Sequence, residues 1–256
     1  MSKGESGLLT TVFPECEEEG QEYEEHFVNG PFIGTVWGQD EGFNAYTPVM
    51  GCSVNGHAPT GCVSLAMAEV MNYYQHPNSI TWNPSGSGVT TTNQLIAAIG
   101  ATLNTSYSCT GSGADMKDVD DTFLLYGYAN ADYYSNYNAT VAENNLWNSK
   151  PVIVGAGTKW YAPWKGHAWV IEGVWRWTEY VCHIGNEVWD PNGLNRGLPP
   201  DSDHNWFPKR SYLRFYMNWG WYGDANGWYG YAPIGWTPNG SAPHQYWDEM
   251  IANITP

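Results

Sequence analysis

Residues 60–77 read TGCVSLAMAEVMNYYQHP and predict a single buried helix. Apolar side chains recur there at spacings of three and four residues, which puts them on one helical face: Val63, Ala66, Met67, Val70, Met71 and Tyr74. Thr60 is the expected N-cap, and His76-Pro77 is expected to end the helix. Packing of the apolar face, more than intrinsic propensity, should stabilise it.

Helical patterns precede strand patterns along the chain. Two further helices are predicted at residues 94–103 and 116–128. Beyond Pro151, short apolar runs predict strands at 152–154, 168–174, 212–219 and 228–231, with a tight hairpin turn at Asn226-Gly227. Helices followed by antiparallel strands favour an α+β domain over a doubly wound sheet.

The composition excludes several classes of protein. The 256 residues include 10 basic and 26 acidic side chains, giving a net charge of −16, and 16% of them are aromatic. So many aromatic residues exclude intrinsic disorder over most of the chain. The scarcity of lysine and arginine argues against nucleic acid as a partner. No apolar run reaches the ~20 residues of a transmembrane helix.

Two stretches stand apart from the predicted elements. Residues 14–25 contain seven glutamates, so residues 1–30 are expected to form an acidic, mobile segment before a single domain of residues 31–256. Residues 175–210, rich in Trp, Asn, Pro and Asp, are expected to form a long inserted surface loop.

The cysteine pattern gives no framework. The five cysteines lie at positions 16, 52, 62, 109 and 182 without a C-x-x-C pair, which predicts neither a disulfide scaffold nor a structural zinc site. An odd number leaves at least one thiol free. Cys52 fits either a buried hydrophobic residue or a thiol capable of oxidative pairing. The histidines have no metal-ligand spacing.

Cys62 and His167 could together perform thiol chemistry. Cys62 lies at the start of the predicted helix, where backbone N–H groups and the helix dipole should lower the pKa of a thiol. His167 follows Gly166 at the start of an apolar strand. Each residue alone also fits a buried core side chain, but a Cys and a His on separate elements form the two parts of a nucleophilic site.

Several blocks of the sequence resemble the streptopain family of bacterial cysteine peptidases. They are APTGCVSLAMAEVMNYYQHP at 58–77, GHAWVIEG at 166–173 and NWGWYG at 218–223, in the order of the family. Upstream, WGQ at 37–39 resembles the segment that supplies the oxyanion-hole glutamine. Downstream, MIANITP at 250–256 resembles the closing strand.

The resemblance implies a papain-like α+β fold, in which a helical part carrying Cys62 packs against an antiparallel sheet carrying His167, with the active-site cleft between them. It implies that Cys62 is the nucleophile and His167 the general base, as a thiolate–imidazolium pair. Gln39 would donate its amide to the tetrahedral oxyanion alongside the Cys62 backbone N–H.

The resemblance also implies roles for residues around the base. Asn218 would orient the His167 ring, although a tryptophan or a backbone carbonyl shares this work in the family. Trp219 and Trp221 would wall the site and shield that contact from water. Trp221, Gly61 and Gly166 are the expected substrate-binding residues.

The implied activity is that of an endopeptidase acting on proteins or peptides, with a preference for an apolar side chain just upstream of the scissile residue. It requires no metal or organic cofactor. The family is secreted and made as a zymogen with an inhibitory prodomain, and none is recognisable in this chain, which would then be a monomeric mature enzyme. Two alternatives remain open at this point: a Cys-His amidase or acyltransferase acting on cell-wall peptides, and a non-catalytic, aromatic-rich surface binding module.

Overall fold

The computed structural model describes residues 13–80, 82, 90–162, 166–184, 205–230 and 235–256. Helix α1 (Cys62–Tyr74) lies in the centre of the core, as the apolar spacing predicts, and Val63, Met67 and Val70 are at most 3% exposed. The expected cap is wrong by one residue. Gly61 is the N-cap, with φ at 89°, and within the described residues the buried Thr60 hydroxyl has no hydrogen-bond partner.

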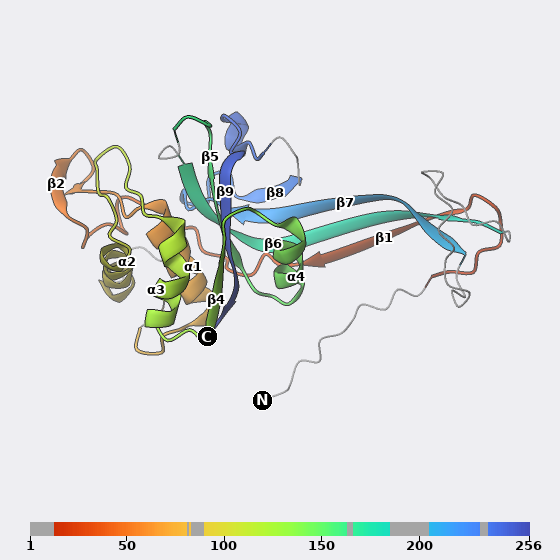
Figure 1. Ribbon diagram of the computed structural model, residues 1–256, viewed down its shortest axis with the longest axis horizontal. Helices are drawn as coiled ribbons and strands as arrows, with labels where there is room; N and C mark the ends of the chain where they lie inside the picture. Colours follow the sequence, from red (N-terminus) through yellow and green to blue (C-terminus); the bar gives the residue numbers. More distant parts are fainter. Residues whose placement is uncertain (1–12, 81, 83–89, 163–165, 185–204, 231–234) are drawn as a thin grey trace. The chain divides into compact units, whose positions relative to one another are not determined.

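The other predicted helices are also present, as α2 (Thr90–Thr102) and as the short 3-10 helix η1 (Met116–Asp118) followed by α3 (Val119–Leu125). A further helix, α4 (Ala139–Trp147), was not predicted. Figure 1 shows α1, α2 and α3 on one side of the central strands and α4 on the other. The core on the α1 side includes Ile153, Ala168, Val170 and Ile251 from the sheet.

The strands form one large antiparallel sheet and a small two-stranded one. The large sheet has the order β4 (Asn130–Tyr134), β9 (Tyr246–Thr255), β5 (Val152–Gly157), β6 (Gly166–Cys182), β7 (Trp206–Asn218) and β8 (Gly227–Gly230), and β1 (Glu22–Asn29) also pairs with β6. The pairs β4/β9, β5/β6, β5/β9 and β7/β8 are antiparallel. Strands β2 (Val49–Cys52) and β3 (Gly56–His57) form the small sheet. The fold is therefore α+β, as predicted.

The tight turn predicted at Asn226-Gly227 is wrong. Strand β7 ends at Asn218 and β8 begins at Gly227, so a longer loop of residues 219–226 joins them. The Asn226 side chain closes this loop by accepting a hydrogen bond from the Trp219 N–H at 3.0 Å. Asn226 acts through its side chain here and not as a turn residue.

The chain divides into two compact units. One contains residues 1–28 and 175–213, and the other contains residues 29–174 and 214–256. Residues 175–182 and 206–210, expected as part of a loop, belong to strands β6 and β7, while residues 185–204 lie outside the described residues. Part of the acidic run forms β1, because exposed glutamates alternate there with less exposed residues such as Tyr23 and Phe27. A single domain over 31–256 stays a prediction.

Two disulfides contradict the prediction of no disulfide framework. Cys16 pairs with Cys182 in the first unit, and Cys52 pairs with Cys109 in the second, at sequence separations of 166 and 57. Bridging requires Cα atoms a few ångströms apart, a property of the folded chain that cysteine spacing does not reveal. Among the described residues, no helix has the length and apolar character needed to cross a bilayer.

Candidate active site

Cys62 is the first residue of α1 and the one cysteine outside a disulfide. Its thiol lies within hydrogen-bonding reach of backbone groups of Ala168 on β6 and of Val63 in the first helical turn. Burial raises the pKa of the thiol, and these backbone contacts oppose that rise without cancelling it. The backbone groups at the start of the helix thus lower the thiol pKa, as expected, but burial of the sulfur raises it by more.

His167 is the second residue of β6 and is held by the loop that follows β7. Its Nε2 lies 2.7 Å from the Trp219 backbone oxygen. A carbonyl can only accept, so the ring proton is assigned to Nε2, which leaves Nδ1 with a free lone pair. Burial lowers the pKa of the imidazole to about 4, although the contact with Trp219 opposes that change.

Aromatic rings surround the imidazole. Trp169 and Trp219 lie nearly parallel to it at centroid distances of 6.3 and 6.0 Å, and Trp221 is tilted at 4.7 Å. A second imidazole, that of His244, lies 6.3 Å away and lowers the His167 pKa further.

Asn218 does not contact the imidazole in the manner expected. Its side chain is 0% exposed, donates from Nδ2 to the Thr35 backbone oxygen at 3.0 Å, and accepts from the Gly220 N–H at 3.2 Å. The backbone carbonyl of Trp219 makes the contact with His167 instead. Consecutive residues near a strand end point to opposite faces, so the side chain of Asn218 turns to the interior.

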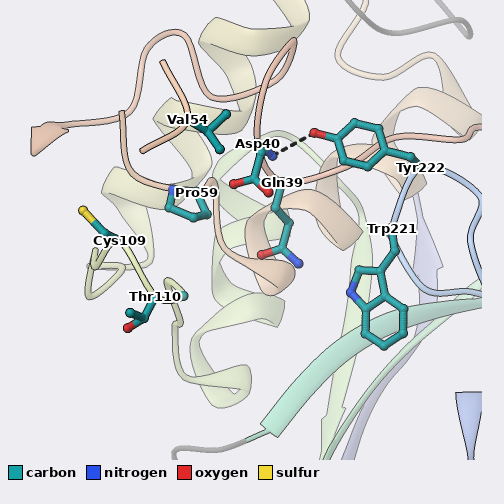
Figure 2. Close-up of a pocket in the computed structure, with 10 residues that line it drawn as sticks. Gln39, Asp40, Val54, Pro59, Cys109, Thr110, Trp221 and Tyr222 are labelled. Carbon is teal, nitrogen blue, oxygen red and sulfur yellow. Dashed lines mark hydrogen bonds between the residues drawn. The ribbon is translucent and has the colours of Figure 1, made fainter. Parts of the chain in front are cut away.

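Gln39 lies in a pocket of about 520 Å³. In Figure 2 its side chain occupies the middle of this pocket, with Thr110 and Cys109 on one side and Trp221 on the other. The Gln39 backbone oxygen accepts a hydrogen bond from the Thr60 N–H at 2.8 Å, which ties the loop to the residues just before α1. Cys62 and His167 are not among the lining residues of this pocket.

Tyr222 holds the Gln39 loop from the other side, a role that no pattern in the sequence indicated. Its N–H donates to the Trp37 oxygen at 2.9 Å, and its hydroxyl accepts from the Asp40 N–H at 3.1 Å (Figure 2) and donates to the Glu41 oxygen at 3.2 Å. The ring packs directly over Gly38, where an added Cβ would lie 2.2 Å from ring carbons.

The two glycines expected in substrate binding occupy different settings. Gly61 has φ at 89° and faces the Ser112 backbone, 3.3 Å from the position of an added Cβ, so a side chain there would be strained. Gly166 is exposed at the start of β6, opposite Gly157 on β5. Sequence reasoning also missed two buried glutamates, Glu69 and Glu172, each only 1% exposed. The signal for Glu172 was an acid within an apolar strand.

A free thiol at a helix start and a neutral imidazole on the adjacent strand are the chemical groups of a cysteine-type peptidase. The family model for the Peptidase C10 family matches residues 37–94 and 83–229. The chain therefore belongs to the Peptidase C10 family, the streptopain family of cysteine peptidases, as the sequence blocks predict.

Solved structures share the fold at low sequence identity. Active wild-type interpain A, a cysteine protease of Prevotella intermedia, matches at a TM-score of 0.60 and 21% identity, covering 88% of this chain and 94% of that one. A prointerpain A fragment of the same organism matches at a TM-score of 0.56 and 20% identity, covering 90% of this chain and 73% of that one. No curated protein sequence matches the chain.

Proposed function

We propose that the protein is a cysteine endopeptidase in which Cys62 is the nucleophile and His167 the base. The observation that carries this proposal is the proximity of the Cys62 thiol, the one free thiol of the chain, to the backbone of Ala168, the residue next to His167. It supports a thiol and an imidazole in adjacent positions, contributed by a helix and a strand.

The pKa directions favour a resting pair that is neutral. Burial raises the pKa of the Cys62 thiol and lowers that of the His167 imidazole, so each charge alone is disfavoured. Proton transfer creates both charges together, and their attraction in a water-poor site offsets part of the desolvation cost. We infer that the thiolate–imidazolium pair forms as the peptide binds.

The reaction then follows the ordinary order of thiol catalysis. Nδ1 of His167 takes the thiol proton as Sγ attacks the scissile carbonyl, and the Gln39 amide and Cys62 N–H donate to the oxyanion. The imidazolium protonates the leaving amine as the C–N bond breaks and a thioester forms. A water molecule, deprotonated by His167, attacks the thioester and releases the acid and the thiol.

The decisive test compares wild type with Cys62→Ala and His167→Ala on a casein-type protein substrate. We expect kcat/KM to fall by at least about 10³ in both variants, because each removes one half of the catalytic pair. His26→Ala, a change at an exposed histidine of the other unit, should retain activity. Cleavage by Cys62→Ala at the wild-type rate would refute the proposal. Cleavage of peptidoglycan fragments in preference to protein would favour an amidase.

Several finer expectations belong to the same proposal. The pairing of four cysteines supports secretion, because disulfides persist in oxidising compartments. The likeness to a pro-form supports synthesis with an inhibitory prodomain. A preference for an apolar residue upstream of the scissile one, Trp221, Gly61 and Gly166 as substrate contacts, and a monomeric state are proposed from the family resemblance.

A further inference from the structure

Four polar side chains form a buried group between α1 and the sheet, which we call the carboxyl cluster. Its members are at most 2% exposed: Thr35, Glu69, Glu172 and Asn218. Acidic residues are almost never buried to this extent unless their oxygens are hydrogen-bonded or the carboxyl is neutral. Two of them in one cluster call for a physical explanation.

Hydrogen bonds hold every member of the carboxyl cluster in place. The Thr35 hydroxyl donates to Glu69 Oε1 at 3.0 Å, and Asn218 Nδ2 donates to the Thr35 backbone oxygen at 3.0 Å. The Asn218 amide lies close enough to both carboxyl groups to lower their pKa values. Glu172 Oε2 accepts from the Ile33 N–H, and the Phe32 N–H donates to the Glu172 backbone oxygen at 3.0 Å. The cluster thus bridges four segments of the chain.

Each of these segments carries a group of the proposed catalytic site. Thr35 lies on the segment that leads to Gln39, and Glu69 lies on α1 two turns after Cys62. Glu172 lies on β6 after His167. Asn218 immediately precedes Trp219, whose backbone oxygen contacts His167.

The two carboxyl groups cannot both be ionised at low cost. Burial raises the pKa of Glu172 to about 7 and that of Glu69 well above its ordinary value, and the charge of Glu172 adds to the rise for Glu69. The groups facing them are the Asn218 amide, the Thr35 hydroxyl, the backbone of residues 32–34, and the Tyr216 phenol, whose own pKa Glu172 raises. Backbone N–H donors stabilise the ionised form of Glu172, so Glu172 loses its proton first and the remaining proton stays on Glu69.

We propose that the carboxyl cluster, with one proton held on Glu69, positions Cys62, His167 and Gln39 for reaction, and that loss of this proton at alkaline pH disrupts the site. The inference rests on the proposed function for its catalytic consequence. Glu69, Glu172, Asn218 and Thr35 are positioning residues in this scheme, because none of them touches the reacting atoms.

Glu69→Gln tests the proton, because glutamine is isosteric with a protonated glutamate and cannot ionise. The readout is the ratio of kcat/KM at about pH 8.5 to that at about pH 6.5, taken for each variant against itself. A site that needs a neutral group at position 69 loses activity as Glu69 ionises, so the ratio should be severalfold higher in E69Q than in wild type. Glu249→Gln removes another carboxyl of raised pKa outside the cluster and should keep the wild-type ratio.

Thermal unfolding without substrate tests the cluster independently of peptidase activity. A folded-state pKa above the unfolded one means that the folded protein binds more protons in between, so stability falls as pH rises through that interval. The fall in Tm between about pH 6 and 9 should be smaller in E69Q than in wild type, and Glu172→Gln should also reduce the dependence if E69Q does not fold.

The outcomes separate the two proposals. Identical activity ratios and identical Tm slopes in wild type and E69Q would overturn the shared proton. A wild type without peptidase activity would overturn the proposed function instead, and the Tm slopes would still decide on the cluster. A flattened Tm slope with an unchanged activity ratio would show that the proton stabilises the fold without positioning the site, which overturns the inference.

Discussion

Gly38→Ala tests whether Tyr222 positions Gln39. An added Cβ at residue 38 would lie 2.2 Å from the ring of Tyr222, more than 1 Å short of ordinary contact. The φ angle of Gly38 is not in the positive region, so alanine fits its backbone and the effect is steric alone. The ring must move, and its hydroxyl then leaves the Asp40 N–H and Glu41 oxygen on either side of the loop.

The magnitude follows from this displacement. A shift of about 1 Å in a catalytic donor costs on the order of 10² in rate, so kcat should fall by about that factor. The cost in stability is smaller, about 1–2 kcal/mol, because Tyr222 is 49% exposed and its ring can turn toward solvent. Tm should therefore fall by only a few degrees, and the loss of activity should far exceed the loss of folded protein.

Two assays distinguish this mechanism from general damage. Peptide hydrolysis requires the oxyanion donor, whereas alkylation of Cys62 by iodoacetamide does not, and Cys62 is the one free thiol. G38A should thus lose hydrolysis and keep its alkylation rate. Gly230→Ala, where an added Cβ meets nothing within 4 Å, is the matched control. A kcat within about threefold of wild type, or alkylation that falls in parallel with kcat, would refute the reasoning.

Three further predictions concern the same unit. Gln39→Ala should lower kcat for peptide hydrolysis by about 10²–10³, and adding Gly38→Ala should lower kcat little further, because both substitutions act through the Gln39 amide. A double variant whose loss of kcat equals the product of the two single losses would contradict this. Removing the disulfide with Cys52→Ser/Cys109→Ser should destabilise the protein by about 4 kcal/mol, for a separation of 57 residues, as measured by urea unfolding. It should also lower kcat/KM, because Cys109 lines the pocket that contains Gln39. The control Cys16→Ser/Cys182→Ser should leave kcat/KM nearly unchanged. Because burial lowers the pKa of His167 from 6.5 to about 4, the unfolded state binds the proton first, and the protein loses up to about 3 kcal/mol of stability as pH falls through this interval. His167→Gln should therefore unfold with a weaker dependence on acid pH, and an unchanged dependence would contradict the burial of the imidazole.

Local patterns predicted the elements that local physics determines. The spacing of Val63, Met67 and Val70 predicted α1 almost to the residue, because the buried face of a helix appears in the sequence as apolar residues three and four positions apart. The apolar run at 152–154 predicted β5, because a strand that is buried on both faces appears in the sequence as a short continuous apolar run. Strand β1 escaped notice because its alternation of Tyr23 and Phe27 with charged residues lies inside an acidic run.

Features that depend on the approach of distant segments could not be predicted this way. The pairing of Cys52 with Cys109 follows from the fold and leaves no trace in spacing. The same holds for Asn218, since proximity in sequence to Trp219 does not say which way its side chain points. Only the folded chain shows that a backbone oxygen contacts His167 while the asparagine faces Thr35.

The position of the carboxyl cluster follows from the geometry of the two elements that meet there. Strand periodicity puts Ala168, Val170 and Glu172 on one face of β6, and Ala168 and Val170 pack there in the same core as α1. Helix periodicity puts Glu69 nearly in line with Cys62. Helix α1 and strand β6 therefore meet twice, once through the Cys62 thiol and Ala168 and once through Glu69 and the cluster.

An apolar pair at Glu69 and Glu172 would avoid burying carboxyl groups, but it would leave the Ile33 N–H and the Thr35 hydroxyl without these acceptors. Hydrogen bonds are directional, however, and apolar contacts are not. Two apolar side chains would hold α1 near β6 without fixing how far one slides along the other, and a slide of about 1 Å would misplace Cys62 relative to His167 at a cost of about 10² in rate. On this argument the buried carboxyls keep the catalytic geometry, so Glu69→Met/Glu172→Leu should lower kcat in the protein that remains folded, and an unchanged kcat would show that the cluster positions nothing.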